Sequence, residues 1–173
     1  MTILITIIVL AIITLLGLAA SKPDKFRIQR ATVIHAPAEK IFPFINDLKL
    51  WSLWSPWEKM DPAMKKTVSG AAAGVGAVHE WEGPKTGSGR MEIIESAAPA
   101  KVGLKLDFFK PMKAQHFAEF TLVPKDGGTE VTWAMFGSQP FIGKIFSIFC
   151  SVEKICGPQF EQGLGDLKAT AEK

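Results

Sequence analysis

The chain has 173 residues, of which 47% are hydrophobic and 21% are charged, and its formal net charge is +3. These values are typical of one globular domain with an appendage, and they exclude a disordered chain. The lysines are scattered, so we expect no nucleic-acid partner. Cys150 and Cys156 fall in one predicted helix, which favours reduced core thiols, and no spacing of ligand residues predicts a metal site.

Residues 3–20 form an apolar segment without charge, in which Thr6 and Thr14 carry the only polar side chains. A helix of this length is nearly enough to cross a hydrocarbon core of about 30 Å. No basic residue precedes the segment, and it is longer than the core of a usual signal peptide, which favours a membrane anchor. The small residues Ala19-Ala20-Ser21 keep a cleaved signal peptide open as the alternative.

Basic residues gather directly after this segment, at Lys22, Lys25, Arg27 and Arg30. Because positively charged flanks stay on the cytoplasmic side of a membrane, we expect a single-pass membrane protein whose domain is cytoplasmic. The predicted organisation is a transmembrane anchor at 1–21, a linker at 22–25 and one domain at 26–173.

The domain begins with a strand and two short helices. Residues 26–35 alternate between apolar and polar side chains, which predicts the strand. Pro37 at a favourable first position and Glu39 in the first turn then predict a helix. Asn46-Asp47 marks its end or the step into a second short helix.

Tryptophans are concentrated just beyond this point. Trp51, Trp54 and Trp57 lie within seven residues, and each ring can bury on the order of 200 Å². We expect two of the three to fill the joint between the short helices and the sheet. The alternative is that they line the mouth of a pocket.

Glycine- and proline-rich turns separate six further predicted strands, at residues 64–68, 77–82, 90–96, 100–109, 113–123 and 129–136. Short turns between consecutive strands predict antiparallel pairing. Alternation assigns eleven side chains of the last three strands to the buried face: Val102, Leu104, Leu106, Phe108, His116, Ala118, Phe120, Leu122, Val131, Trp133 and Met135. Alternation does not settle which face of its strand carries His79.

The segment 140–173 has apolar side chains at helical spacing: Phe141, Ile145, Phe149, Val152, Cys156, Phe160, Leu164 and Leu167. This pattern predicts a helix about 45 Å long that lies across the sheet with Phe149 on its buried face. Gly157-Pro158 predicts a kink or a junction of two helices, because proline lacks a backbone donor and clashes with the preceding turn.

Together these elements predict an α+β fold: a curved antiparallel sheet wrapped around a long C-terminal helix, two short helices after the first strand, and an N-terminal transmembrane helix. Three groups of segments carry a more specific pattern: residues 34–42 with 45–47 and 51–57, residues 74–83, and residues 118–122 with 128–133. The order of elements and these segments resemble the helix-grip fold of the SRPBCC superfamily, which includes START and birch-pollen-allergen-like proteins. Within it, they resemble the bacterial polyketide cyclase/dehydrase and lipid transport group.

The resemblance covers roughly residues 26–171 and implies the fold more strongly than a function, because the superfamily includes lipid carriers, cyclases, oxygenase domains and co-chaperones. A cavity between sheet and C-terminal helix would be lined by large apolar side chains, which suits a lipid-like ligand. The candidate ligand-binding residues are Trp54, Trp57, Trp81, Met91, Leu106, Phe108, His116, Trp133, Met135, Phe146 and Phe149. We expect a membrane-tethered module that binds or transports a hydrophobic small molecule or lipid without a cofactor.

Two alternatives remain open. One is a cyclase-, dehydratase- or hydrolase-like enzyme in which His116 or His79 acts with Glu119, Glu80 or Glu82 in the same cavity. The chain has no tyrosine and no serine-nucleophile, zinc-protease or paired-carboxylate motif, so we assign no catalytic residue. The other alternative is an interaction domain with a filled core, since close packing is the default in proteins.

Overall fold

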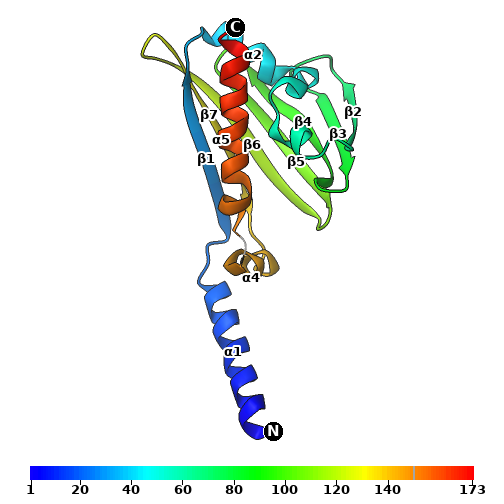
Figure 1. Cartoon of the computed structure of the whole chain (residues 1–173), viewed down its shortest axis with the longest axis vertical. Coiled ribbons are helices and arrows are strands. Elements are labelled where there is room, and N and C mark those ends of the chain that lie inside the picture. Colours follow the sequence, from blue (N-terminus) through cyan, green and yellow to red (C-terminus); the bar gives the residue numbers. More distant parts are fainter. Residues whose placement is uncertain (150) are drawn as a thin grey trace.

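The computed structural model describes residues 1–149 and 151–173 (Figure 1). Its helices are α1 (Thr2–Ala20), α2 (Ala38–Asn46), the 3₁₀ helix η1 (Leu48–Leu53), α3 (Pro56–Met60), α4 (Phe141–Phe149) and α5 (Val152–Ala171). Its strands are β1 (Lys25–Ile34), β2 (Lys65–Gly70), β3 (Ala77–Gly83), β4 (Gly87–Ala97), β5 (Lys101–Lys110), β6 (Ala114–Lys125) and β7 (Gly128–Ser138).

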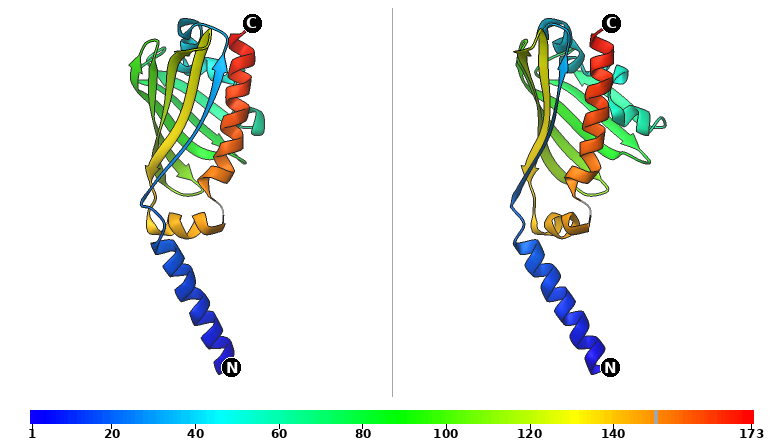
Figure 2. Two further views of the ribbon diagram at one scale, coloured as in Figure 1. Left: turned by 90° about the vertical axis from the view of Figure 1, so that its left-hand side faces the viewer. Right: turned by 60° about the vertical axis from the view of Figure 1, so that its left-hand side comes forward.

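The seven strands form one sheet in the order β1-β7-β6-β5-β4-β3-β2, and each neighbouring pair is antiparallel. Strands β2 to β7 pair in chain order through short turns, and β1 adds beside β7. The sheet curves, and α5 crosses it mainly against β1 (Figure 2). The predicted α+β helix-grip fold is confirmed.

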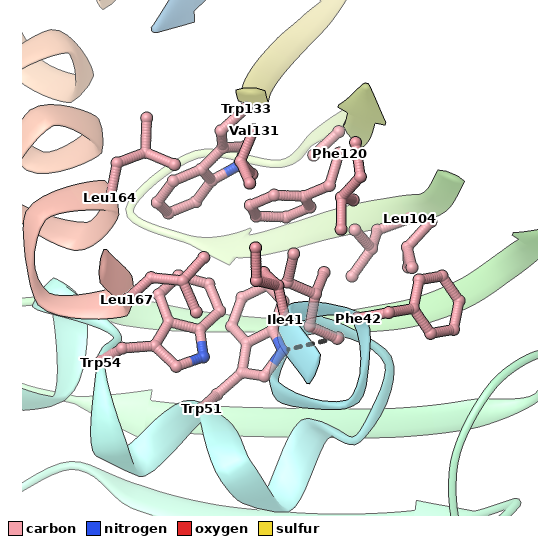
Figure 3. Close-up of a cluster of buried hydrophobic side chains, with 14 of the residues drawn as sticks. Ile41, Phe42, Trp51, Trp54, Leu104, Phe120, Val131, Trp133, Leu164 and Leu167 are labelled. Atoms are coloured by element: carbon pink, nitrogen blue, oxygen red, sulfur yellow. Dashed lines mark hydrogen bonds between the residues drawn. The ribbon is translucent and has the colours of Figure 1, made fainter. Parts of the chain in front are cut away.

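The buried faces of the last three strands are confirmed as well. The predicted inward side chains of β5, β6 and β7 are buried or half-buried, from Val102 to Met135. Their centre is Trp133, which stacks on Phe160 of α5 with ring centroids 4.1 Å apart. It also stacks on Phe120 of β6, with ring centroids 4.9 Å apart (Figure 3). Stacked aromatic pairs add to the burial of their area, so this column joins α5 to the sheet.

The tryptophan-rich segment fills the joint between η1 and the sheet. Trp51 and Trp54 are 4% and 0% exposed, and their indole N–H groups donate to the carbonyls of Ile45 and Phe44, each at 2.9 Å. These bonds satisfy the polar ends of two rings whose bodies are in the core. Trp57 of α3 is only half-buried, so two of the three tryptophans fill the joint, as predicted.

The C-terminal segment differs from the prediction of a kink or a junction of two helices at Gly157-Pro158, because α5 runs through both residues. It forms two helices, of which α4 ends at Phe149 and α5 begins at Val152. At Ser151 the backbone is extended, and its hydroxyl accepts a hydrogen bond from the Lys154 N–H at 3.3 Å, which begins α5 as an N-cap. Pro158 lies inside α5 and does not end the helix. Cys150, which was predicted to be a core thiol, lies outside the described residues.

The predicted burial of Phe149 is wrong. Its side chain is 72% exposed, and Phe146 is 54% exposed. Helix α4 is separate from α5 and runs across the end of α1 instead of along the sheet, so its most exposed apolar side chains do not reach the core (Figures 1 and 2). On α5, Phe160, Leu164 and Leu167 of the predicted stripe are buried.

Helix α1 extends away from the sheet and is long and apolar enough to cross a membrane. Among the described residues it is the one helix with these properties, and its side chains are almost all exposed. A membrane span and a signal sequence share these properties.

Candidate functional site

The domain has two prominent hollows. The larger, of about 770 Å³, is a shallow depression between the β4–β5 turn, the β6–β7 turn and the start of α2. The smaller, of about 370 Å³, is more enclosed and lies between the sheet, α3 and the first turns of α5. Ligand pockets are enclosed and mostly apolar with a few polar groups, so the smaller one, here called the cavity, is the candidate site.

Strands β3 to β7 supply one side of the cavity, and α3 and α5 supply the other. Its wall consists of Trp51, Ser55, Trp57, Glu58, Met60, Met64, His79, Trp81, Lys85, Thr86, Met91, Leu104, Leu106, Phe108, Lys110, Pro111, Ala118, Trp133, Met135, Ile155, Cys156 and Phe160. Methionines and aromatic rings dominate this wall, and such side chains adapt to ligands of irregular shape. Its volume is much larger than a few waters, which disagrees with the alternative of a filled core.

The structure brings seven predicted site residues together at the cavity: Trp57, Trp81, Met91, Leu106, Phe108, Trp133 and Met135. Four others lie elsewhere. Trp54 is fully buried in the core, and His116 packs edge to face on Phe26 with ring centroids 4.8 Å apart. Phe146 and Phe149 are exposed on α4, away from the cavity.

Sequence reasoning named Trp57 of α3 but missed two methionines, one at the end of that helix and one in the segment after it. Met60 and Met64 line the cavity beside Trp57. The spacing of three residues between Trp57 and Met60 was the available signal for Met60, because side chains at that spacing share one side of a helix. Met64 lies beyond the end of α3, so helical spacing does not identify it. Ile155 also lines the cavity, and it was missed because it does not belong to the apolar stripe by which the buried face of α5 was predicted.

His79 is the polar group that stands out in the cavity. It is 4% exposed, and among the described residues neither of its ring nitrogens has a hydrogen-bond partner. Burial lowers the pKa of His79; the charge of Glu58 opposes this shift and that of Lys66 adds to it. The imidazole is therefore neutral near pH 7 and offers one donor and one acceptor.

Two other titratable groups of the wall, Glu58 and Cys156, are occupied or inert. Glu58 is ion-paired with Lys66. Burial raises the pKa of the Cys156 thiol to about 11, so it is a poor nucleophile at neutral pH. The wall thus combines a large apolar area with an imidazole that has no hydrogen-bond partner in the part of the chain that the structure describes.

Asp61 fixes the β3–β4 turn that forms one rim of the cavity. Its buried carboxylate accepts hydrogen bonds from the N–H groups of Lys85 at 2.8 Å and Thr86 at 3.0 Å, and from the Thr86 hydroxyl at 3.1 Å. Burial raises the pKa of Asp61, but these hydrogen bonds outweigh burial and lower it below its ordinary value. Asp61 is therefore a charged structural clamp, not a reactive acid.

The carboxylates that the sequence paired with histidines do not face the cavity. Glu119 is ion-paired with Arg27 at 2.7 Å, and Glu82 with Lys110 at 2.9 Å. Glu80 is exposed on the outer face of β3. The acid–base pairs expected with His79 or His116 are therefore not assembled; Glu58 is the carboxylate in the cavity wall.

The exposed residues of the wall mark where the cavity reaches the surface: Lys85, Lys110, Pro111 and Ile155. They belong to the β3–β4 turn, the β5–β6 turn and the first turn of α5. Strand register places both turns at the sheet edge where β1 begins and β7 ends, since Lys25 pairs with Ser138 and every adjacent strand is antiparallel. This edge is the one next to α1 and α4 (Figure 1).

A curved sheet around a long C-terminal helix, with a cavity between them, defines a helix-grip protein of the SRPBCC superfamily. Residues 25–172 match the model of the family described as polyketide cyclase / dehydrase and lipid transport, so the chain belongs to that family. Family and cavity together support a domain that binds a hydrophobic ligand. No curated protein sequence matches the chain.

Solved structures agree on the fold. A protein from Chromobacterium violaceum superposes with a TM-score of 0.62 at 19% identity, covering 88% of this chain and 99% of its own. The di-domain ARO/CYC StfQ from the steffimycin biosynthetic pathway superposes with a TM-score of 0.63 at 10% identity, covering 86% of this chain and 51% of its own. Ara h 8.0201 superposes with a TM-score of 0.55 at 12% identity, covering 85% of this chain and 97% of its own. Likeness at these identities shows the fold alone.

Proposed function

We propose that this protein is a membrane-tethered module that binds or carries a small hydrophobic molecule with one hydrogen-bonding group. The observation that carries the proposal is the cavity of about 370 Å³, which is apolar except for a few groups and contains the imidazole of His79, for which the described residues provide no hydrogen-bond partner. Helix α1, long and apolar enough to cross a bilayer, supports the tether.

Volume and polarity narrow the class of ligand. Pockets for small molecules span about 300–1,000 Å³, so this one suits a single small molecule or one acyl chain rather than a two-chain lipid. A buried polar group without a partner costs about 1–3 kcal/mol. A ligand hydroxyl, carboxyl or carbonyl at His79 would recover that penalty, which favours an amphiphile over a pure hydrocarbon.

A direct test is titration of the full chain in detergent with cis-parinaric acid, a fluorescent single-chain fatty acid that accepts energy from tryptophan. Trp57, Trp81 and Trp133 in the cavity wall are suitable donors. We expect saturable energy transfer, and mass spectrometry of the freshly purified protein should show a bound small molecule. An empty protein that gives no saturable transfer would contradict the proposal.

A matched pair of variants locates the site. Ala118 lies in the cavity wall, and Ala118→Phe should fill the space and weaken binding by about tenfold or more, equivalent to about 1.4 kcal/mol. Ala169 is exposed on α5, so Ala169→Phe adds the same ring outside the cavity and should leave binding unchanged. Equal affinities in two folded variants would place the probe elsewhere.

A catalytic function is the second candidate. It is favoured by the neutral imidazole of His79 and the carboxylate of Glu58 in one cavity wall, which could serve as acid–base groups for a cyclase- or dehydratase-like reaction. The test compares the small molecules that co-purify with the wild-type chain and with His79→Asn. A dehydration predicts a mass difference of one water between them, and a ring closure without loss of water predicts equal masses with different chromatographic retention. Identical masses and identical retention argue against catalysis.

A further inference from the structure

We infer that α4 and the β5–β6 turn form a surface that lies in the headgroup region of the same bilayer that α1 crosses, and that the ligand enters the cavity there from the bilayer. This membrane-contact surface consists of Phe141, Ile142, Phe146 and Phe149 of α4 with Phe109 and Met112 beside the β5–β6 turn. The inference rests on the proposed tether and the proposed ligand binding, and it adds the docking partner and the route of the ligand.

Helix α4 exposes apolar side chains and buries a charged one, which is the reverse of the usual pattern for a protein surrounded by water. Four of its six large apolar side chains, those of the membrane-contact surface, are 48–72% exposed, and their spacing places them on one side of the helix. The residue that it buries is Lys144, on the opposite side. Single exposed apolar side chains are ordinary, but a contiguous apolar face on a short helix marks a contact surface. An amphipathic helix of this kind is stable at a membrane interface, with its apolar side among the upper acyl chains.

The position of α4 selects a lipid surface as the partner. It contacts α1 and runs across the C-terminal end of that helix instead of continuing its direction (Figures 1 and 2). The linker holds it there, because Lys144 Nζ binds Asp24 Oδ1 at 2.6 Å and the Gln139 N–H donates to the Asp24 carbonyl at 2.7 Å. When α1 crosses the bilayer, its end is at the bilayer surface, and α4 is placed in the interfacial layer.

Charge at this end of the molecule complements anionic headgroups. Exposed Lys22, Lys25, Lys113 and Lys154 surround the membrane-contact surface, and none has an ion-pair partner within residues 1–149 and 151–173. The nearby acidic groups are neutralised internally. Asp24 is ion-paired with Lys144, and Glu153 is ion-paired with Arg30. Basic residues beside an apolar face are the pattern of an interfacial lipid-binding segment.

The cavity opens at the same end. Lys110 and Pro111 of its rim adjoin Phe109 and Met112, and Ile155 of its rim is in the first turn of α5, just after α4. Contact of this surface with the bilayer would therefore cover the opening with lipid rather than with water. A hydrophobic ligand could then pass between membrane and cavity without crossing the aqueous phase.

The contact is tested on the unmodified full chain in vesicles of phosphatidylcholine and phosphatidylglycerol that contain a phosphatidylcholine with a photoreactive group near its headgroup. After illumination, peptide mapping should find label in residues 141–149 and 109–112, and none in residues 124–128 of the β6–β7 turn at the opposite end. Absence of label from 141–149 would overturn the inference. Cross-links between two copies of α4 in place of lipid label would also overturn it, in favour of a dimer interface.

Ligand entry is tested with Phe146→Asp/Phe149→Asp and, as the matched control, Leu53→Asp/Val123→Asp, which changes exposed apolar residues of η1 and of β6. In the reconstituted full chain, the α4 variant should take up cis-parinaric acid from donor vesicles several-fold more slowly than the wild type and the control. Uptake from a cyclodextrin complex should be equal in all three. Equal uptake from vesicles would overturn entry from the bilayer. A wild-type chain that takes up the probe from neither source would overturn the proposed ligand binding and with it the entry route, while the lipid labelling decides the contact surface separately.

Discussion

Phe160 packs α5 against the sheet by stacking its ring on Trp133 of β7. It is buried and lies nearly parallel to Trp133, with an angle of 6° between the two rings. Phe160→Ala removes both the burial and the stacked contact, so unfolding of the full chain in detergent should require about 3–5 kcal/mol less free energy. Denaturant titration followed by tryptophan fluorescence measures this difference.

Phe149→Ala is the matched control for that substitution. Because Phe149 is mostly exposed, its truncation should change the free energy of unfolding in detergent by no more than about 0.5 kcal/mol. If instead Phe149→Ala were as destabilising as Phe160→Ala, α4 would pack on the sheet and the exposed face described here would be wrong.

His79 makes stability depend on pH in a definite direction. Burial lowers its pKa in the folded chain below the ordinary value of about 6.5, which applies in the unfolded chain. Below about pH 6.5 the unfolded chain therefore binds a proton that the folded chain resists, and stability falls as the pH decreases toward the folded-state pKa. His79→Gln should remove this part of the pH dependence.

The comparison is made from thermal midpoints of wild type and His79→Gln between about pH 8 and pH 5. Burial also lowers the pKa of His116, but that group is present in both chains, so its contribution cancels in the difference. The two curves should separate only below about pH 6.5, with the wild type falling more steeply. Parallel curves would show that His79 titrates alike in the folded and unfolded chains.

At the scale of the element, α5 can approach the sheet closely because of one glycine. A Cβ at Gly163 would lie 2.9 Å from Trp133 Cζ3 and 3.0 Å from Pro56 Cδ. Gly163→Ala should therefore destabilise the domain by about 1–3 kcal/mol through overpacking, which exceeds the helix propensity that alanine adds.

Gly165, two residues along the same helix, has no heavy atom within 4 Å of the corresponding Cβ position. Gly165→Ala should stabilise the chain by about 0.5–1 kcal/mol, since alanine restricts the unfolded chain and favours the helix. Opposite signs for the two glycines in the same denaturant titration are the expected result. A stabilising Gly163→Ala would mean that α5 lies farther from Trp133.

At the scale of the whole molecule, the prediction is that α1 stays attached and that the domain faces the cytoplasm. Only 6% of the apolar span is buried by the rest of the protein, and exposing such a surface to water costs roughly 25 cal/mol per Å². The basic residues that follow the span favour the cytoplasmic side for the domain.

Two reporters fused to the C-terminus, one active only in the cytoplasm and one only outside it, decide the orientation. N-terminal sequencing of the purified protein decides whether the segment is retained. We expect cytoplasmic activity and an intact N-terminus. A new N-terminus near Ser21 would identify a signal peptide, and activity of the external reporter would reverse the topology.

The sequence by itself determined the architecture of the sheet. Alternation in residues 100–109 and 113–123 identified the inward faces that carry Leu104 and Phe120, because a strand with one buried face must repeat with a period of two. The same alternation placed Leu106, Phe108 and Met135 on the side where the cavity lies. These features are local, so a single chain reveals them.

Tertiary structure decided what covers each apolar face. Helical periodicity ran through Phe149 without interruption, but α4 is a separate helix that packs against α1 and presents that face outward. Likewise, the environment of His79 depends on α3 and on Lys66 of the neighbouring strand, which alternation within β3 does not reveal. The physical reason is common to both cases: periodicity records which side of an element is apolar, whereas the position of the remaining elements determines whether that side meets the core, a ligand or a membrane.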